Sequence, residues 1–256
     1  MCVDGSNAEE QAVQGMYGCW RDFYLWVWQA YALTDDSWNP AGISDACNVN
    51  LPFGKVVNSA YLINYCLTDN RGTQWHSTED YQSASRAADN RFHGSFYQRF
   101  IEYNGAAEAD SETGRFAAQD RTNLHCPLFN LGSVSDSAGN RASVLIHESW
   151  HHWQHKHGFN TNHIGGCPNG QCDYYYFHGL GAYEFGSLDG YDTNPQHLLF
   201  HSPYQVCAEF EADLAESAKP SVPAVVTQTA RNIGNIRLAN CFANAVPYRI
   251  GNPRPW

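Results

Sequence analysis

Apolar residues recur at helical spacing in several separate stretches of the chain. In residues 8–34, Trp20, Phe23 and Trp26 lie three positions apart in a dense aromatic pattern, which predicts a largely buried helix. The same periodicity, with capping residues and breakers at the ends, predicts further helices over residues 55–67, 79–103, 141–156, 203–219 and 223–245. In the last of these, the expected apolar side consists of Val226, Ile233, Ile236, Leu238 and Phe242.

Extended structure is predicted in one place. Leu124–Leu131 is a short apolar segment, and Pro127 within it indicates an edge strand or an irregular one. Residues 159–203 are rich in Gly, Asn, Tyr and His, which is typical of loops. We therefore expect a mainly helical α+β fold with a small irregular sheet, in a single domain. Its N-terminal part is residues 1–140, and residues 141–256 hold the metal-binding helices described below together with a loop-rich C-terminal part.

Composition narrows the class of protein. The chain has 256 residues, of which 16% are charged and 14% aromatic, and this mixture argues against a disordered chain. The formal net charge of −11 makes nucleic acid an unsuitable partner. No run of about 18 apolar residues occurs, so the sequence predicts no transmembrane helix.

Cysteines indicate the compartment. Nine are scattered over the chain, which favours disulfides and an oxidising environment. Cys167 and Cys172 form the expected local pair, because Pro and Gly between them favour a closing turn. We expect a secreted or periplasmic protein. Since no basic and apolar leader follows Met1, we also expect an export signal to have been removed.

The segment His147-Glu148-Ser149-Trp150-His151 carries the chemistry. Two histidines four apart lie on one face of a helix and can bind one Zn²⁺ ion through neutral imidazoles. Glu148 lies about 100° further around the helix, where it can act as a general base on a water molecule at the metal. Residue types and spacing thus predict a catalytic zinc site with Glu148 as its catalytic residue.

A third protein ligand is needed to leave one position open for water. His157 would follow the metzincin pattern, but Gln154 replaces the glycine that this pattern needs, and no downstream methionine exists. Asp189 is an alternative that faintly resembles an aspzincin ligand. Glu209 is our choice, with Asp213 one turn further on to accept the spare N–H of a ligand histidine.

His-Glu-x-x-His followed by Glu209-Phe210-x-Ala212-Asp213 resembles the gluzincin metallopeptidases. The pattern is closest to that of the membrane-embedded CAAX prenyl endopeptidases, and it also resembles soluble bacterial proteins with a His-Glu-x-x-His-x-x-Gln helix. The resemblance covers residues 144–155 and 207–216. It implies a zincin-like domain around a central metal helix, with His147, His151 and Glu209 as ligands, Glu148 as base and Asp213 in support.

We therefore expect a zinc metallopeptidase that acts on a peptide or protein substrate. Alternatives are a zinc hydrolase of a non-peptide amide or ester, and a metal-binding protein without turnover; a histidine-rich stretch at 147–163 favours the latter but does not explain Glu148. A further donor should stabilise the oxyanion. The candidate donors are His178, Tyr183, His201 and Tyr204.

Overall fold

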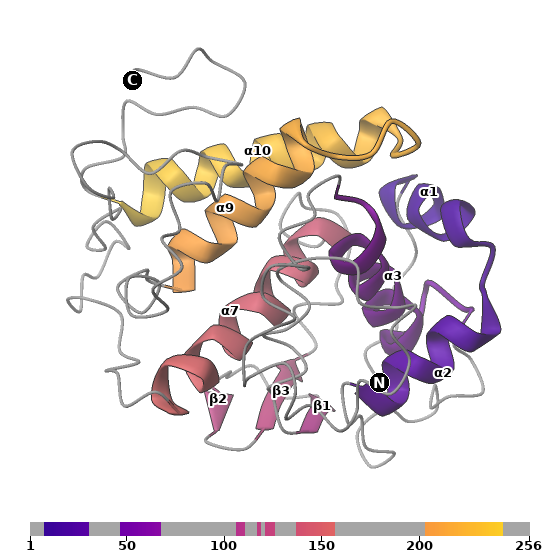
Figure 1. Ribbon diagram of the computed structural model, residues 1–256, viewed down its shortest axis with the longest axis horizontal. Coiled ribbons are helices and arrows are strands. Elements are labelled where there is room, and N and C mark those ends of the chain that lie inside the picture. The colour runs from indigo at the N-terminus through magenta and orange to yellow at the C-terminus, as the bar shows by residue number, and fades with distance from the viewer. Residues whose placement is uncertain are drawn as a thin grey trace, which may run out of the picture.

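The computed structural model describes residues 8–30, 47–67, 106–110, 117–118, 121–125, 137–156 and 203–242. This part of the chain is mainly helical (Figure 1). Its helices are α1 (Ala8–Tyr17), α2 (Arg21–Ala30), α3 (Pro52–Tyr65), α7 (Ala138–Lys156), α9 (Pro203–Glu216) and α10 (Ala224–Cys241). Helix α7 packs against α3 on one side and α9 on the other, and α9 also packs along α10 (Figure 1).

The first predicted helix, residues 8–34, is wrong as a single element, because the chain turns between α1 and α2. Gly18 and Cys19 have positive φ angles of 56° and 54°. Gly18 donates its N–H to the carbonyl of Gln14 at 2.9 Å, which ends α1 at a left-handed residue. Aromatic periodicity continues across this turn, so the pattern alone does not reveal the break.

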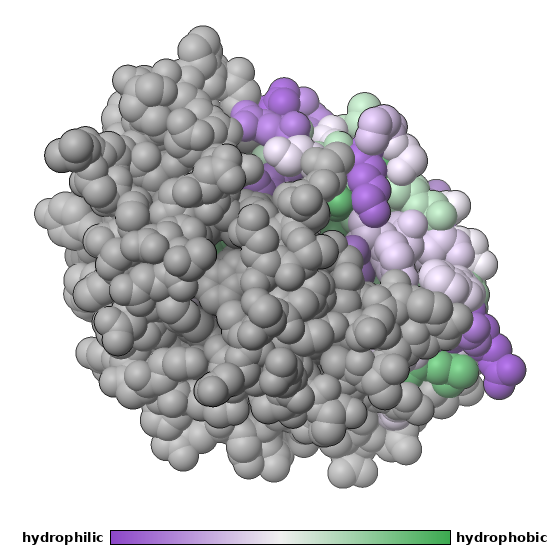
Figure 2. All heavy atoms as spheres, viewed as in Figure 1, coloured by the Kyte–Doolittle hydropathy of each residue, from purple (hydrophilic) through white to green (hydrophobic). Residues whose placement is uncertain are grey.

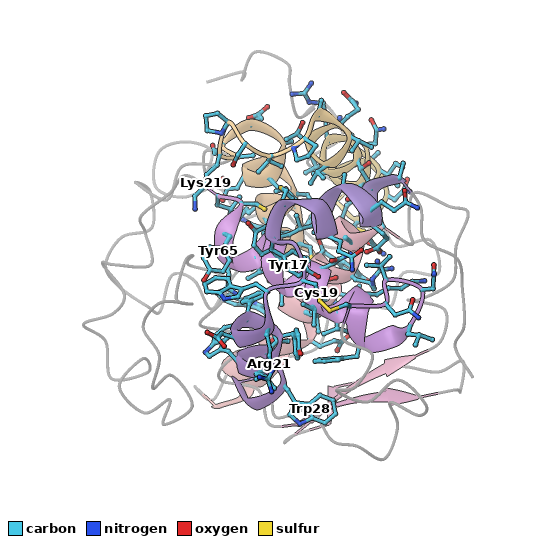
Figure 3. All side chains as sticks on the ribbon, turned by 90° about the vertical axis from the view of Figure 1, so that its right-hand side faces the viewer. Tyr17, Cys19, Arg21, Trp28, Tyr65 and Lys219 are labelled. Carbon is cyan, nitrogen blue, oxygen red and sulfur yellow. A yellow bond between two sulfur atoms is a disulfide. The ribbon has the colours of Figure 1, made fainter. Side chains whose placement is uncertain are left out.

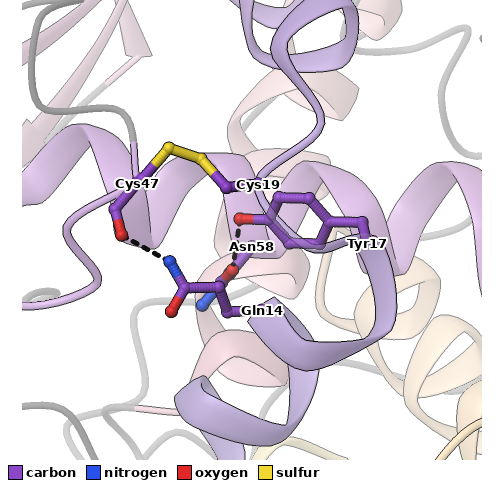
Figure 4. Close-up of a disulfide and its surroundings, with 5 residues drawn as sticks. All are labelled: Gln14, Tyr17, Cys19, Cys47 and Asn58. Atoms are coloured by element: carbon purple, nitrogen blue, oxygen red, sulfur yellow. Dashed lines mark hydrogen bonds between the residues drawn. A yellow bond between two sulfur atoms is a disulfide. The ribbon is translucent and has the colours of Figure 1, made fainter.

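A disulfide holds this turn in place. Cys19 is bonded to Cys47, with the two Cα atoms 5.5 Å apart. Nearby, Gln14 donates to the carbonyl of Cys47, and the Tyr17 hydroxyl donates to Asn58 Oδ1 at 2.7 Å (Figure 4). The end of α1 is therefore joined both to the segment before α3 and to α3 itself.

Helix α3 is buried on nearly every side. It begins after the extended residue Leu51, with Pro52 in the first turn, where a missing N–H costs nothing. Gly54 lies so close to the backbone of Asn48 that an added Cβ would collide with the carbonyl group there. The Ser59 hydroxyl reaches the carbonyl of Ala138 at 3.2 Å, which links α3 to the start of α7.

The hydrophobic core lies where α1, α2 and α3 meet α7, α9 and α10. Its largest fully buried apolar side chains are Trp150, Phe23 and Phe53. Trp26 is also buried, whereas Trp20 is 40% exposed, so only part of the aromatic pattern of residues 8–34 enters the core. On α10, Val226, Ile233 and Leu238 are buried as expected, but Ile236 is 53% exposed and is a wrong assignment.

Helix α7 starts three residues earlier than the predicted Arg141, because buried acceptors satisfy its first N–H groups. The Ser137 hydroxyl accepts from Asn140 N at 3.1 Å. The Glu9 carboxylate accepts from Ala138 N at 3.1 Å and from Gly139 N at 3.4 Å. Helix α1 therefore caps α7 across 129 residues of sequence.

Buried charged groups also connect the helices. Arg141 on α7 forms an ion pair with Glu10 on α1. Between α9 and α10, Arg237 binds both carboxylate oxygens of Glu211 at 2.6–3.0 Å. The Ser143 hydroxyl of α7 donates to the same carboxylate at 2.8 Å. A single buried carboxylate thus bridges α7, α9 and α10.

The described strands form a small three-stranded sheet in the order β1-β3-β2, made of β1 (Ala106–Asp110), β2 (Ala117–Ala118) and β3 (Arg121–His125). Strand β3 pairs parallel with β1 and antiparallel with β2. The predicted strand 124–131 overlaps β3 only at residues 124–125, and β3 is the middle strand rather than an edge. Pro127 comes after β3 ends, so it does not interrupt the pairing.

Polar and apolar side chains are both visible on the face of the described part that Figure 2 shows. Figure 2 shows hydrophilic and weakly polar side chains at the upper right, with apolar ones in isolated patches. The Lys219 ammonium lies 5.8 Å from the ring centroid of Tyr65, and Figure 3 shows these two side chains together. None of the helices in the described ranges is both long and apolar enough to cross a membrane. The predicted helix 79–103 and loop 159–203 lie outside those ranges except at Pro203, the first residue of α9.

Candidate metal centre

The motif at residues 147–151 lies within α7, which continues to Lys156. Leu145 and Ile146, just before the motif, and Trp150 within it are buried and fix the phase of the helix against the core. His147 and His151 are therefore one turn apart on one face of α7. The side chain of His151 lies outside the described part of the structure.

His147 is partly exposed and faces α9. Its ring centroid is 4.9 Å from that of Tyr204, with the planes inclined by 59°. Its Nδ1 atom is 3.8 Å from the sulfur of Cys207. Both contacting residues lie on one face of α9, three positions apart, so this face determines the surroundings of the imidazole.

Cys207 is completely buried between α7 and α9. Its thiol donates a hydrogen bond to the carbonyl of Ser143, with sulfur and oxygen 3.1 Å apart. Burial raises the pKa of this thiol; the charge of Arg237 opposes the rise, and Glu211 adds to it. Cys207 is therefore a neutral thiol at physiological pH.

Glu148 is 6% exposed, although it is a carboxylate. Its negative charge contributes to the raised pKa of Cys207, so Glu148 lies near the same contact between α7 and α9. A carboxylate in such a water-poor position can exchange a proton with a group brought close to it.

Glu209 and Asp213 are both buried on α9, with exposed fractions of 1% and 0%. Gln205, one turn earlier on the same helix, donates to Glu209 Oε1 at 2.9 Å. Because Glu209 follows Cys207 by two residues, its side chain leaves α9 about 200° around the helix from the Cys207 side chain. The contacts that bring Cys207 and Tyr204 to His147 therefore place Glu209 on another face of α9.

Within the described ranges, no group of three or more His, Cys, Asp or Glu side chains is arranged to hold a metal ion. The side chain of His151 lies outside this part of the structure, and so do the other predicted residues. They are the alternative ligands Asp189 and His157, the candidate donors His178, Tyr183 and His201, and the expected pair Cys167 and Cys172. The remaining candidate donor, Tyr204, is the one that contacts His147.

Sequence reasoning missed the part played by two residues. The sequence pattern gives no role to Cys207 or to Glu211, yet both side chains are fully buried. Tyr204, Cys207 and Glu211 recur at spacings of three and four, which is the spacing of one helix face. That spacing was the available signal, but it does not reveal which partner the face contacts.

Comparisons with protein-family models, with curated proteins and with solved structures find no match to this chain. The candidate site is therefore judged on its own chemistry.

Proposed function

We propose that this protein is a zinc-dependent metallopeptidase with a zincin-like domain, in which Glu148 activates water for attack on a peptide bond. The observation that supports this most is the position of residues 147–151 inside a continuous helix whose neighbouring positions, Leu145, Ile146 and Trp150, are buried. Helical spacing directs the proposed ligands His147 and His151 to one face of α7, and the buried carboxylate Glu148 follows His147 directly. The donor set suits zinc, which prefers nitrogen ligands of this kind.

The protein's own groups have distinct tasks in this proposal. A zinc ion bound by His147 and His151 would supply a Lewis acid that polarises the scissile carbonyl and lowers the pKa of water. Glu148 takes a proton from the attacking water and passes it to the leaving amine. Tyr204, whose ring lies against His147, is the candidate donor that we propose for the developing oxyanion.

The third ligand is proposed to be Glu209, supported by Asp213. The side chain of Glu209 leaves α9 on a different face from that of Cys207. Asp189 remains the alternative ligand. We also propose export to an oxidising compartment, which the Cys19–Cys47 disulfide supports.

The experiment compares Glu148→Gln with the unmodified protein. Zinc content should stay at one ion per chain, while hydrolysis of a denatured protein substrate should fall by at least about 100-fold, since the proton acceptor is lost. Glu216→Gln is the matched control, because Glu216 is an exposed glutamate on α9. Activity of Glu148→Gln near that of the control would refute the role of Glu148.

The ligands are tested by zinc affinity. His147→Ala and His151→Ala should each abolish stoichiometric binding, and Glu209→Ala should weaken it sharply. If Asp189→Ala weakens binding while Glu209→Ala does not, the third ligand is Asp189. Stoichiometric zinc in the double variant His147→Ala/His151→Ala would contradict the whole site.

A further inference from the structure

Two contacts in series connect the backbone of α7 to the ring of His147 through α9. The sulfur of Cys207 lies 3.1 Å from the carbonyl oxygen of Ser143 and 3.8 Å from Nδ1 of His147. Ser143 and His147 are one helical turn apart, so both lie on the face of α7 that meets Cys207. Cys207 itself is completely buried, so its sulfur is shielded from water.

The hydrogens in this series can be assigned from the chemistry of its atoms. A carbonyl oxygen only accepts, so the hydrogen between Ser143 and Cys207 belongs to the thiol. One lone pair of that oxygen serves the helix of α7, and the second is free to accept from the thiol. Because a thiol has a single hydrogen, the sulfur faces His147 as an acceptor, and the hydrogen between them must belong to Nδ1.

We infer that Cys207 is a positioning residue that holds His147 in the tautomer with hydrogen on Nδ1, so that Nε2 is the ring nitrogen without a hydrogen. The hydrogen bond at one ring nitrogen decides which nitrogen is left to bind a metal. Tyr204, packed against the ring, limits its rotation. The use of Nε2 for zinc rests on the proposed function, whereas the tautomer itself is independent of it.

Cys207 thus accepts the spare N–H of a ligand histidine, which is the role that the sequence predicted for Asp213. A thiol is a weaker acceptor than a carboxylate, so it fixes the tautomer without adding a negative charge beside the metal. The neutral imidazole is the form that ligates zinc.

The test measures the tautomer in the metal-free protein. Histidine labelled with ¹³C and ¹⁵N gives a Cδ2 chemical shift that differs between the two neutral tautomers, and His147→Gln identifies the signal. The unmodified protein, at a pH where the ring is neutral, should show hydrogen on Nδ1. A signal of the Nε2–H form would overturn the inference, and this reading needs no variant at position 207 to fold.

Variants at position 207 separate positioning from packing. Cys207→Ala should give a mixture of tautomers and about tenfold weaker zinc binding, while Cys207→Ser, which keeps a hydroxyl donor and acceptor, should recover most of both. The matched control is Cys66→Ala, which removes a similarly buried thiol at the residue after α3 and should change neither. An unchanged tautomer in Cys207→Ala would also overturn the inference.

The two proposals fail in different ways. If the unmodified protein binds no zinc but shows hydrogen on Nδ1, the proposed metallopeptidase is wrong and the role of Cys207 stands. If zinc binds and Glu148→Gln is inactive, but His147 has hydrogen on Nε2, the metallopeptidase stands and the role of Cys207 is wrong.

Discussion

Glu9 offers a direct test of how the start of α7 is held, because its carboxyl group is both a helix cap and a buried acid. Burial raises its pKa from 4.5 to about 7, against the opposing effects of the Arg141 charge and of hydrogen bonds from Gly139 and Ala138. The folded protein therefore keeps a proton on Glu9 at pH values where the unfolded chain has lost it. The protonated Glu9 carboxyl group therefore contributes its whole stabilising free energy below about pH 4.5, and this contribution is lost as the pH rises through about 7.

The size of the effect follows from the two pKa values. Each pKa unit is worth about 1.4 kcal/mol, so the difference between 4.5 and about 7 corresponds to about 3 kcal/mol over the full titration. The part of this free-energy change that falls between pH 5 and pH 8 is about 2.5 kcal/mol. Glu9→Gln keeps the shape of the side chain and an acceptor oxygen but removes the titration.

The assay is urea unfolding of the unmodified protein and of Glu9→Gln at pH 5 and pH 8, with the disulfide intact. From pH 5 to pH 8, the unfolding free energy of Glu9→Gln should rise by about 2.5 kcal/mol relative to that of the unmodified protein. Taking a difference between the two proteins removes titrations that they share. Glu216→Gln, at an exposed position, is the control and should show a much smaller shift.

One result would refute the reasoning about Glu9. If Glu9→Gln lost stability relative to the unmodified protein between pH 5 and pH 8, the ionised carboxylate would be the stabilising form. Its hydrogen bonds to the first N–H groups of α7 would then outweigh the loss of solvation.

Two further predictions concern packing. Arg237→Ala should lower the unfolding free energy by about 3–5 kcal/mol, because it leaves the buried Glu211 carboxylate without its countercharge. The double variant Arg237→Met/Glu211→Gln should recover much of this loss, as measured by urea unfolding. An equal loss of unfolding free energy in the single and the double variant would contradict the explanation. Gly54→Ala should destabilise the protein, because the new Cβ would collide with the backbone of Asn48. Gly15→Ala in α1, where the added Cβ has open space around it, should instead raise the unfolding free energy by about 0.5–1 kcal/mol. Thermal unfolding of both variants measures this contrast, and equal effects would refute it.

Local patterns predicted the helices whose boundaries depend on nearby residues. The expected range 203–219 contains α9, and the expected 55–67 differs from α3 by two or three residues at each end. Proline at the start and apolar residues at helical spacing suffice for such elements. The turn at Gly18 and Cys19 was missed because its positive φ angles are held by a disulfide partner 28 residues away, which no local pattern reveals.

The candidate site could be predicted only where its chemistry is contained in one helix. The helical setting of His147 and Glu148 follows from the motif and from the apolar residues before it. The contact with Cys207 depends on which face α9 turns toward α7, and every residue of α9 from Val206 to Ala215 is buried. Without a polar face to fix its phase, the sequence of α9 is compatible with more than one orientation, so the hypothesis for Glu209 was not constrained by burial.

The Cys19–Cys47 bond encloses the 27 intervening residues in a covalent loop. A single proteolytic cut anywhere in that loop would leave two fragments that still migrate together on a non-reducing gel. Reduction would release the N-terminal fragment, and with it α1 and the two glutamates that it contributes to α7. After such a cut, the redox state of this one disulfide thus determines whether α1 stays covalently attached to the part of the chain that contains α7 and its histidines.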